Sequence, residues 1–235
     1  GHLGELFLES HGVVFSPETA RINEFSVKNT DVSLTLGSIE STDTVPSEPL
    51  YWKILLDEID FENVGFALKM PQDSLFVRTM LPKTTLKNGV IDLKEASYYV
   101  KSFGIDNAEL AYGPKEELFL QQIGLQLDSI YYCGKDIRAN IEEFVLKERS
   151  GLELVSTGGR IVSDSVLIEI PKFTMKTTAS SLDLQTKIGW DVLEMKKTGV
   201  LSAKINAEIG KGDVAKILGG RDTLFLQTYP NKPFV

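Results

Sequence analysis

The amino-acid sequence predicts a mostly β protein: an antiparallel meander of repeated hairpins that forms a curved sheet, trough or sandwich, with a few short helices near the C-terminus. Three observations support this fold class. Apolar and polar residues alternate with period two in many short runs, as in half-buried strands. Thr, Val, Ile, Phe and Tyr, which favour strands, supply most of these runs. Helical periodicity is rare, so the runs are expected to be joined locally, as in antiparallel sheets.

The runs that predict strands follow one another along the whole chain. They lie at residues 5–10, 22–29, 31–36, 56–63, 64–70, 89–95, 103–112, 122–132, 142–148, 151–156, 165–170, 172–177 and 181–190. The segment 37–49 is rich in Ser, Thr and Pro and predicts a loop. This loop is a candidate sub-boundary in what is otherwise one elongated β domain over residues 1–235.

Helices are expected at three places. The best candidate is the segment 212–220, "GDVAKILGG", with Asp213 in the N-cap region and Gly219 as the stop signal. A second short helix is expected at 222–229, and a single helical turn at 95–103. The stretch 70–87 has a mixed pattern that predicts neither helix nor strand.

One short unit recurs in the strand pattern. In the stretch "FGIDNAELAY", Phe103 and Ile105 precede two polar residues, Asp106 and Asn107, and the apolar alternation resumes at Ala108. The same pattern occurs at 59–68 and 123–132. In a two-residue hairpin, the residues on either side of the turn pair directly and point to the same face. The unit therefore predicts hairpins whose apolar residues share one face of a sheet.

Three looser copies have expected turns of four, five and six residues, at 28–31, 147–151 and 176–181. The shared apolar face is either the core of a sandwich or the lining of a groove that accepts a ligand, because a sheet with one apolar face has to bury that face. The residues predicted to form it are Phe25, Val27, Ile59, Phe61, Val64, Phe66, Phe103, Ile105, Leu110, Leu125, Leu127, Phe144, Leu146, Phe173 and Met175.

Composition argues against several classes of function. The net charge of -8 and the pI of about 4.9 disfavour a nucleic-acid or anionic-membrane surface, since both need clustered Lys and Arg. The single cysteine, Cys133, forms no intrachain disulfide and is expected to be a strand-end thiol. His2 and His11 belong to no catalytic or zinc motif, and the glycines form no phosphate-binding loop.

Asp57, Glu58 and Asp60 form an acidic cluster of the kind that a glycosidase uses. On a strand, however, Glu58 and Asp60 fall on the face opposite Ile59 and Phe61, which is expected to be solvated. The sequence therefore predicts no enzymatic activity, no cofactor and no metal site.

The segment 142–184, "EEFVLKERSGLELVSTGGRIVSDSVLIEIPKFTMKTTASSLDL", resembles the AsmA/TamB-like proteins of Bacteroidetes-type bacteria. That family has an F-x-h-x-E-x-SGL-x-h hairpin, where h is hydrophobic, followed by a strand and an h-x-T-x-x-S-x-L hairpin. Segments 51–71, 89–113, 212–220 and 227–234 resemble further parts of the family, so the resemblance covers most of residues 50–235. The matching motif positions are Phe144, Leu146, Glu148, Ser150, Gly151, Leu152, Leu154, Met175, Thr177, Ser180 or Ser181, and Leu182.

The resemblance implies a non-enzymatic segment of a longer periplasmic protein, anchored to the inner membrane by an N-terminal segment outside this chain. Such proteins cross the periplasm as an elongated β-sheet with an apolar groove, and they act in outer-membrane biogenesis or in phospholipid transport between membranes. The implied partners are phospholipid acyl chains and, through regions outside this chain, an Omp85-type outer-membrane barrel. The alternative is a β-sandwich binding or adhesion module at the cell surface, with a glycan-acting enzyme as a more distant one.

Overall fold

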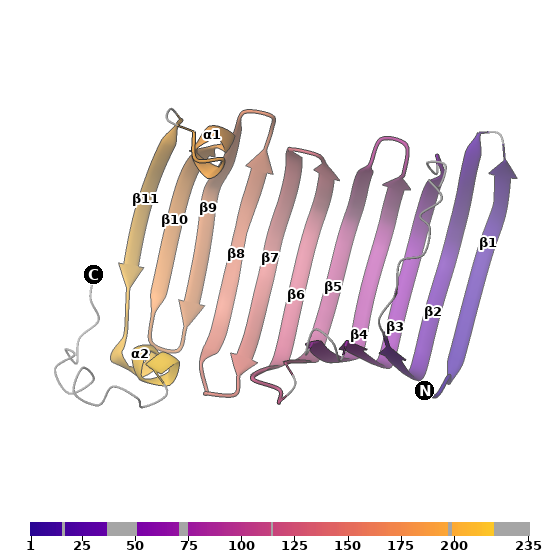
Figure 1. Ribbon diagram of the computed structural model, residues 1–235, viewed down its shortest axis with the longest axis horizontal. Coiled ribbons are helices and arrows are strands. Elements are labelled where there is room, and N and C mark those ends of the chain that lie inside the picture. Colours follow the sequence, from indigo (N-terminus) through magenta and orange to yellow (C-terminus); the bar gives the residue numbers. More distant parts are fainter. Residues whose placement is uncertain (16, 37–50, 71–74, 114, 197–198, 219–235) are drawn as a thin grey trace.

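The computed structural model describes residues 1–15, 17–36, 51–70, 75–113, 115–196 and 199–218. Within these residues, eleven strands form one open sheet, and strands that are consecutive in sequence are neighbours in space (Figure 1). The mostly β fold class is confirmed. The elements are β1 Glu5–Phe15, β2 Glu18–Thr35, β3 Lys53–Met70, β4 Leu75–Asp92, β5 Ser97–Tyr112, β6 Leu118–Cys133, β7 Asp136–Glu148, β8 Glu153–Ser163, β9 Leu167–Thr177, β10 Ser181–Gly189, α1 Trp190–Leu193, β11 Leu201–Glu208 and α2 Lys211–Leu218.

The meander has one parallel step. β2 and β3 pair in parallel, with Phe25 beside Ile59 and Val27 beside Phe61, whereas the other neighbouring strands of the described sheet pair antiparallel. Parallel strands cannot be joined by a tight turn. The loop expected at 37–49 falls in this connection and lies outside the described residues.

Several of the expected hairpin turns are bends inside long strands. Asn63, Asn107 and Ser129 lie within β3, β5 and β6, and they have positive φ angles of 52°, 55° and 64°. Asn29, in the expected turn at 28–31, likewise lies inside β2 with φ 50°. A left-handed residue inside a strand makes a bulge, so the alternation shifts by one residue and the strand bends. The expected turns at 147–151 and 176–181 do connect neighbouring strands, β7 to β8 and β9 to β10.

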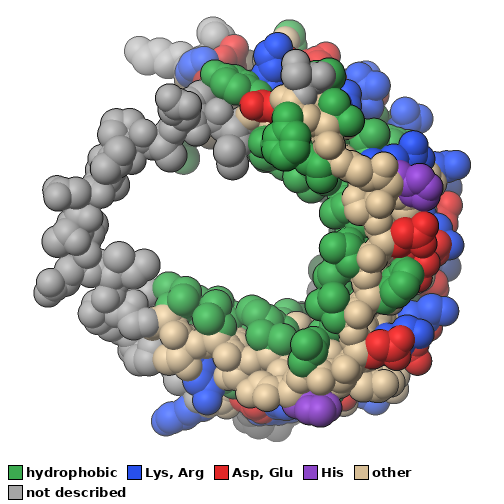
Figure 2. All heavy atoms as spheres, turned by 90° about the vertical axis from the view of Figure 1, so that its right-hand side faces the viewer, with side chains coloured by type: hydrophobic (Ala, Val, Ile, Leu, Met, Phe, Trp, Pro, Cys, Tyr) green, Lys and Arg blue, Asp and Glu red, His purple; other side chains and the backbone are tan. Residues whose placement is uncertain are grey.

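These bends lie on two lines that cross the sheet. Asn29, Asn63, Asn107 and Gln122 follow one line through β2, β3, β5 and β6, and the Asn63 amide donates a hydrogen bond to the Asn29 side-chain oxygen at 3.2 Å. Asn88 in β4 and Ser129 in β6 mark the other line. Seen along the sheet, the strands curl into a C-shaped wall (Figure 2). The bulges explain this curvature, because each one turns the strand that contains it.

The structure favours the trough over the sandwich. The hydrophobic residues that are buried within the described chain are few, namely Val27, Leu56, Ala108 and Ala111, and no large side chain there is fully buried. Two packed sheets would enclose many large apolar side chains between them. In the described residues, a single curved layer with one open apolar side replaces that closed core.

The helices agree with expectation only in part. α2 begins one residue before the segment predicted at 212–220. Asp213 lies in its first turn rather than capping it, and Gly219 lies outside the described residues. The segment 95–103 is a turn followed by the start of β5, so the helical turn predicted there is wrong. The four-residue α1, beginning at Trp190, falls where a strand was expected to end. The helix expected at 222–229 lies outside the described residues.

Candidate functional site on the concave face

Apolar side chains form continuous rows across the sheet, perpendicular to the strands. Residues that pair directly on neighbouring strands point to the same face. We define the Phe103 row as Leu8, Phe25, Ile59, Leu86, Phe103, Leu127, Ile141, Gly159, Phe173, Leu184 and Ile205, which are successive partners from β1 to β11.

A second row lies beside the first. We define the Ile105 row as Leu6, Val27, Phe61, Thr84, Ile105, Leu125 and Phe144, which are successive partners from β1 to β7. The Phe25 and Phe61 rings meet edge to face, with centroids 6.2 Å apart, so the two rows touch each other.

The structure brings all of the predicted apolar residues to this face. Ten of them belong to the two rows. The others continue the face beyond the bends: Val64 beside Leu81, Phe66 and Leu110 on either side of Thr79, Leu146 beside Leu154, and Met175 beside Leu182. Residues that the sequence patterns missed include Leu86, where bulges interrupt the alternation, and Ile141 and Ile205, which lie outside the predicted runs.

The two faces of the sheet differ sharply in charge. Figure 2 shows hydrophobic side chains along the concave side and Lys, Arg, Asp and Glu around the convex side. The charged positions alternate with the apolar rows and pair across strands: Lys28 with Glu62 at 3.4 Å, Glu58 with Lys87 at 2.7 Å, and Lys53 with Asp92 at 3.7 Å. Such exposed pairs contribute at most about 1 kcal/mol each. Their main effect is to keep the convex side hydrated.

The acidic cluster of β3 is engaged in polar contacts. Asp57 accepts hydrogen bonds from Arg21 at 3.0 and 3.1 Å and from Asn23 at 2.9 Å. Glu58 pairs with Lys87, and this hydrogen bond, together with the charge of Glu58, raises the pKa of the lysine. The contacts of Asp57 and Glu58 form a surface ion-pair network, and Asp60 lines a hollow of about 420 Å³ together with Glu24, Glu62 and Lys83.

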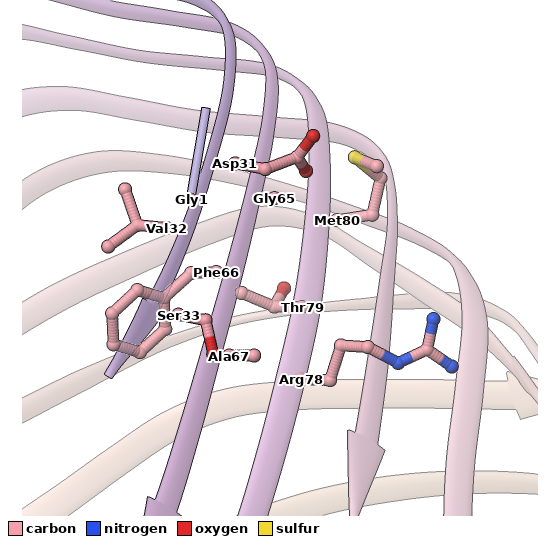
Figure 3. A pocket seen from close by; sticks show the side chains of 10 residues that line it. All are labelled: Gly1, Asp31, Val32, Ser33, Gly65, Phe66, Ala67, Arg78, Thr79 and Met80. Atoms are coloured by element: carbon pink, nitrogen blue, oxygen red, sulfur yellow. The ribbon is translucent and has the colours of Figure 1, made fainter. Parts of the chain in front are cut away.

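Figure 3 shows how neighbouring residues alternate between the two sides of the wall. Val32 and Phe66 project to one side of β2 and β3, whereas Asp31 and Met80 project to the other. They line a hollow of about 280 Å³ together with Gly1, Ser33, Gly65, Ala67, Arg78 and Thr79. Small residues form much of its wall, and the Asp31 carboxylate lies against Gly65, so a side chain at residue 65 would require the carboxylate to move.

The concave face contains two hydroxyl groups that are buried without a hydrogen-bond partner. Thr84, in the Ile105 row, and Thr157, beside Met175, are each 6 % exposed, and their hydroxyls have no partner within the described residues. An unsatisfied buried polar group is destabilising, whereas an apolar group of the same shape is not.

We expect Thr84→Val to be at least about 1 kcal/mol more stable than the matched Thr79→Val variant. Thr79 lies on the same strand, but its hydroxyl donates to the Glu109 carbonyl at 2.8 Å, and this bond is lost in the valine variant. Urea unfolding of the two variants and the wild type measures the difference. Equal stability of the two variants would contradict the assignment of an unpaired hydroxyl at Thr84.

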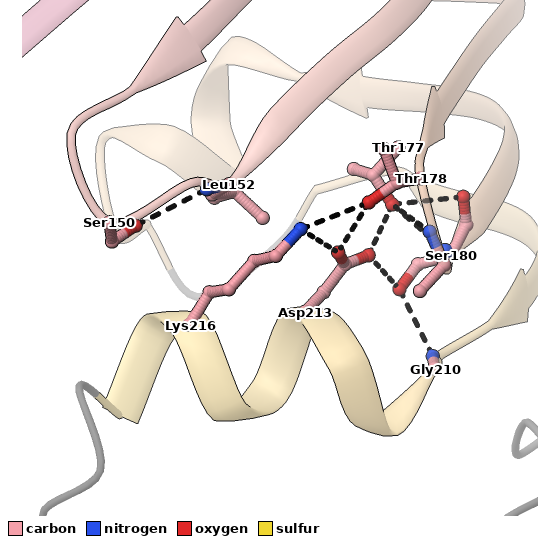
Figure 4. Close-up of polar contacts among 9 residues, drawn as sticks. Ser150, Leu152, Thr177, Thr178, Ser180, Gly210, Asp213 and Lys216 are labelled. Atoms are coloured by element: carbon pink, nitrogen blue, oxygen red, sulfur yellow. Dashed lines mark hydrogen bonds and ion pairs between the residues drawn. The ribbon is translucent and has the colours of Figure 1, made fainter.

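A polar cluster attaches α2 to the turn between β9 and β10 (Figure 4). The Asp213 carboxylate accepts hydrogen bonds from the Thr177 hydroxyl, from the Ser180 hydroxyl at 2.6 Å and from the Thr178 hydroxyl at 3.4 Å. Lys216 lies 4.0 Å away, and the Asp213 side chain is only 4 % exposed. Burial by itself would raise the pKa of Asp213, but the Ser180 and Thr177 hydroxyls and the charge of Lys216 outweigh it and lower the pKa.

We expect Asp213→Asn to weaken the attachment of α2 by about 1–3 kcal/mol. Because the folded-state pKa is lowered, the carboxylate contributes its stability in full above the ordinary pKa of 3.8 and loses it as the pH falls through the lower folded value. Hydrogen exchange of the α2 amides at neutral and acid pH checks both points. The wild type should protect these amides better at neutral pH and approach the variant in acid.

The remaining candidate residues do not converge on a catalytic site. His2 pairs with Asp31 through backbone hydrogen bonds, and the His11 ring contacts the Asn23 side chain. The Cys133 thiol, at the end of β6, donates to the Glu95 carbonyl at 3.6 Å. Among the described residues, no group of three His, Cys, Asp or Glu side chains is placed to hold a metal ion. No helix in that part of the chain is long and apolar enough to cross a membrane.

No protein-family model, no curated protein and no solved structure matches this chain. A functional assignment therefore depends on the structure, and its most distinctive feature is the concave face of the open single layer, whose two rows contain no charged residue.

Proposed function

We propose that this chain is a non-enzymatic segment of an AsmA/TamB-like envelope protein, whose concave face accommodates phospholipid acyl chains. The observation that carries the proposal is the pair of rows that line the open side of the wall with apolar side chains. In this role the protein would act in outer-membrane biogenesis or in phospholipid transport between membranes.

The apolar face is extensive. A soluble monomer seldom exposes a contiguous apolar patch larger than a few hundred Å², and larger patches mark binding sites. The Phe103 row alone extends over eleven strands of the described sheet. An acyl chain gains about 0.8 kcal/mol for each CH₂ group that leaves water, and it needs no catalytic residue to do so. A lipid is therefore a ligand that satisfies this face.

The location follows from the resemblance of segments 51–71, 89–113 and 142–184 to AsmA/TamB-like proteins. A periplasmic position, an inner-membrane anchor upstream of this chain and an Omp85-type barrel partner are parts of the same proposal. Contact with the barrel would involve regions outside residues 1–235.

The adhesion module is the weaker candidate. A β-sandwich module presents its binding residues on loops above a closed core. The described residues form one open layer in which no large side chain is fully buried. The described residues therefore lack the rigid two-layer scaffold that an adhesion module of this kind needs.

The test is native mass spectrometry of the chain after incubation with vesicles of phosphatidylcholine or phosphatidylglycerol that have the same acyl chains. We expect bound lipid from both, at levels within about threefold of each other, because neither row contains Lys or Arg to select an anionic headgroup. Absence of lipid, together with no binding of a fluorescent fatty acid, would reject the proposal.

A further inference from the structure

The wall of the trough changes along its length. β2, β3 and β4 each have 18 residues, β5 and β6 have 16, and β7 has 13. β8 and β9 have 11, β10 has 9 and β11 has 8. At about 3.3 Å per residue, the arc of the wall falls from roughly 59 Å at β2 to roughly 26 Å at β11. β1, at the edge beside β2, has 11 residues. The trough is therefore deepest over β2 to β6 and shallower at both edges, most of all at β10 and β11.

Residues with left-handed backbone conformation have the same distribution as the long strands. The non-glycine residues with positive φ that lie inside strands are Asn29, Asn63, Asn88, Asn107, Gln122 and Ser129, all of them in β2 to β6. The described strands β7 to β11 contain none. A wall with a longer arc surrounds a ligand on more sides, so it removes more of the ligand's surface from water.

From this taper we infer that the acyl chains are held in the deep half, β2 to β6, and that β8 to β11 bind them only weakly. The inference rests on the proposed function and specifies where in the trough the ligand lies. The five deep strands span about 19 Å along the trough axis, at about 4.8 Å between strands. One leaflet of a bilayer has a hydrocarbon depth of about 15 Å, so a phospholipid chain fits along this half.

The exposure of the apolar side chains is lowest on the floor of the deep half and higher toward its rim, where Val32 is 46 % and Phe66 36 % exposed. Val27 and Leu56, in β2 and β3, are each 9 % exposed, because the curled wall shields its own floor. Leu201 and Ile205, in the edge strand β11, are 64 % and 62 % exposed. A ligand that lies against them would keep much of its own surface in water. The rows of the deep half contain no charged residue. An acyl chain, which has no hydrogen-bonding group, can therefore cover them without burying a charge that lacks a partner.

Two phenylalanines provide a matched test, because Phe103 and Phe173 occupy the same row on β5 and β9. Phe103→Gln should weaken binding of a fluorescent fatty acid by at least about tenfold, and Phe173→Gln by less than about threefold. Circular dichroism and thermal unfolding show whether each variant is folded, and Phe103→Leu should restore binding. Equal losses for both glutamine variants, or a larger loss at Phe173, would overturn the inference.

A photoactivatable fatty acid gives a second readout on the wild-type chain and needs no folded variant. After irradiation, peptide mapping should place the adducts in residues 18–35, 53–70, 75–92, 97–112 and 118–133. Adducts concentrated in residues 153–208 would contradict the placement while leaving the proposed function intact. If the wild type yields no adducts and binds no probe, the proposed function fails as well. If native mass spectrometry instead detects a dimer that blocks the trough, the occupant of the trough is a second copy of the chain and not a lipid.

Discussion

Phe61→Glu is expected to reduce binding of acyl probes by at least about 100-fold. Phe61 lies in the middle of the Ile105 row, between Val27 and Thr84, and packs edge to face against Phe25. The substitution removes an aromatic contact with a ligand chain, worth about 1.5–3 kcal/mol. It also introduces a carboxylate that would lose its hydration when an acyl chain binds, and this desolvation makes binding less favourable still. A loss of about 2.7 kcal/mol corresponds to the expected factor.

The control places the same charge on the other side of the wall. Ser102 is exposed and lies between Lys87 and Asp128 on the neighbouring strands, so Ser102→Glu gains one attractive contact and one repulsive contact. Titration of a fluorescent fatty acid into both variants should show normal binding for Ser102→Glu. If Phe61→Glu is folded and binds the probe as tightly as the control, the Ile105 row does not line a lipid site.

The second large effect is expected at a bend. Asn107 has a φ angle of 55°, a conformation that a β-branched residue adopts only with strain. Asn107→Val is therefore expected to lower the free energy of unfolding by about 1–2 kcal/mol. Asn107→Gly should unfold at nearly the wild-type urea concentration, because glycine accepts positive φ without steric cost.

A substitution at the neighbouring residue, Asp106, distinguishes a bend from a hairpin turn at this place. A two-residue type I′ turn at Asp106–Asn107 would need positive φ at both positions. In the structure Asp106 has no positive φ and pairs with Lys83 of β4, so Asp106→Val should be tolerated. Urea unfolding of the three variants measures these differences. Equal destabilisation by Asp106→Val and Asn107→Val would favour the hairpin over the bend.

The sharing of one apolar face was predictable from the sequence, although the hairpins proposed to explain it were wrong at four of their six places. Asn63 and Asn107 suit positive φ both in a tight turn and in a bulge. In a tight turn and in a bulge alike, the apolar residues on either side of the asparagine point to the same face. Phe61 and Val64, or Ile105 and Ala108, therefore lie on the predicted side of the sheet even though the chain continues across the bend instead of reversing.

The connections could not be predicted in the same way. The alternation around Val32 and Phe66 indicates strands but carries no information about their relative direction. The direction depends on where the chain returns after Leu36, and the structure pairs β2 and β3 in parallel. The mixed pattern of 70–87 has a different cause. Pro82 interrupts the period of two inside β4, and the bend at Asn88 follows directly after this stretch.

By itself, the sequence determined that this chain forms strands with one apolar side and one charged side. That information is local, because it depends on which face each successive side chain takes in an extended backbone. The tertiary structure alone decided that the strands form one open wall, with the Phe103 row in register from β1 to β11 and the Ile105 row from β1 to β7. Register, strand length and curvature depend on backbone hydrogen bonds between distant residues and on the alignment of bends in neighbouring strands, and no short stretch of sequence contains them.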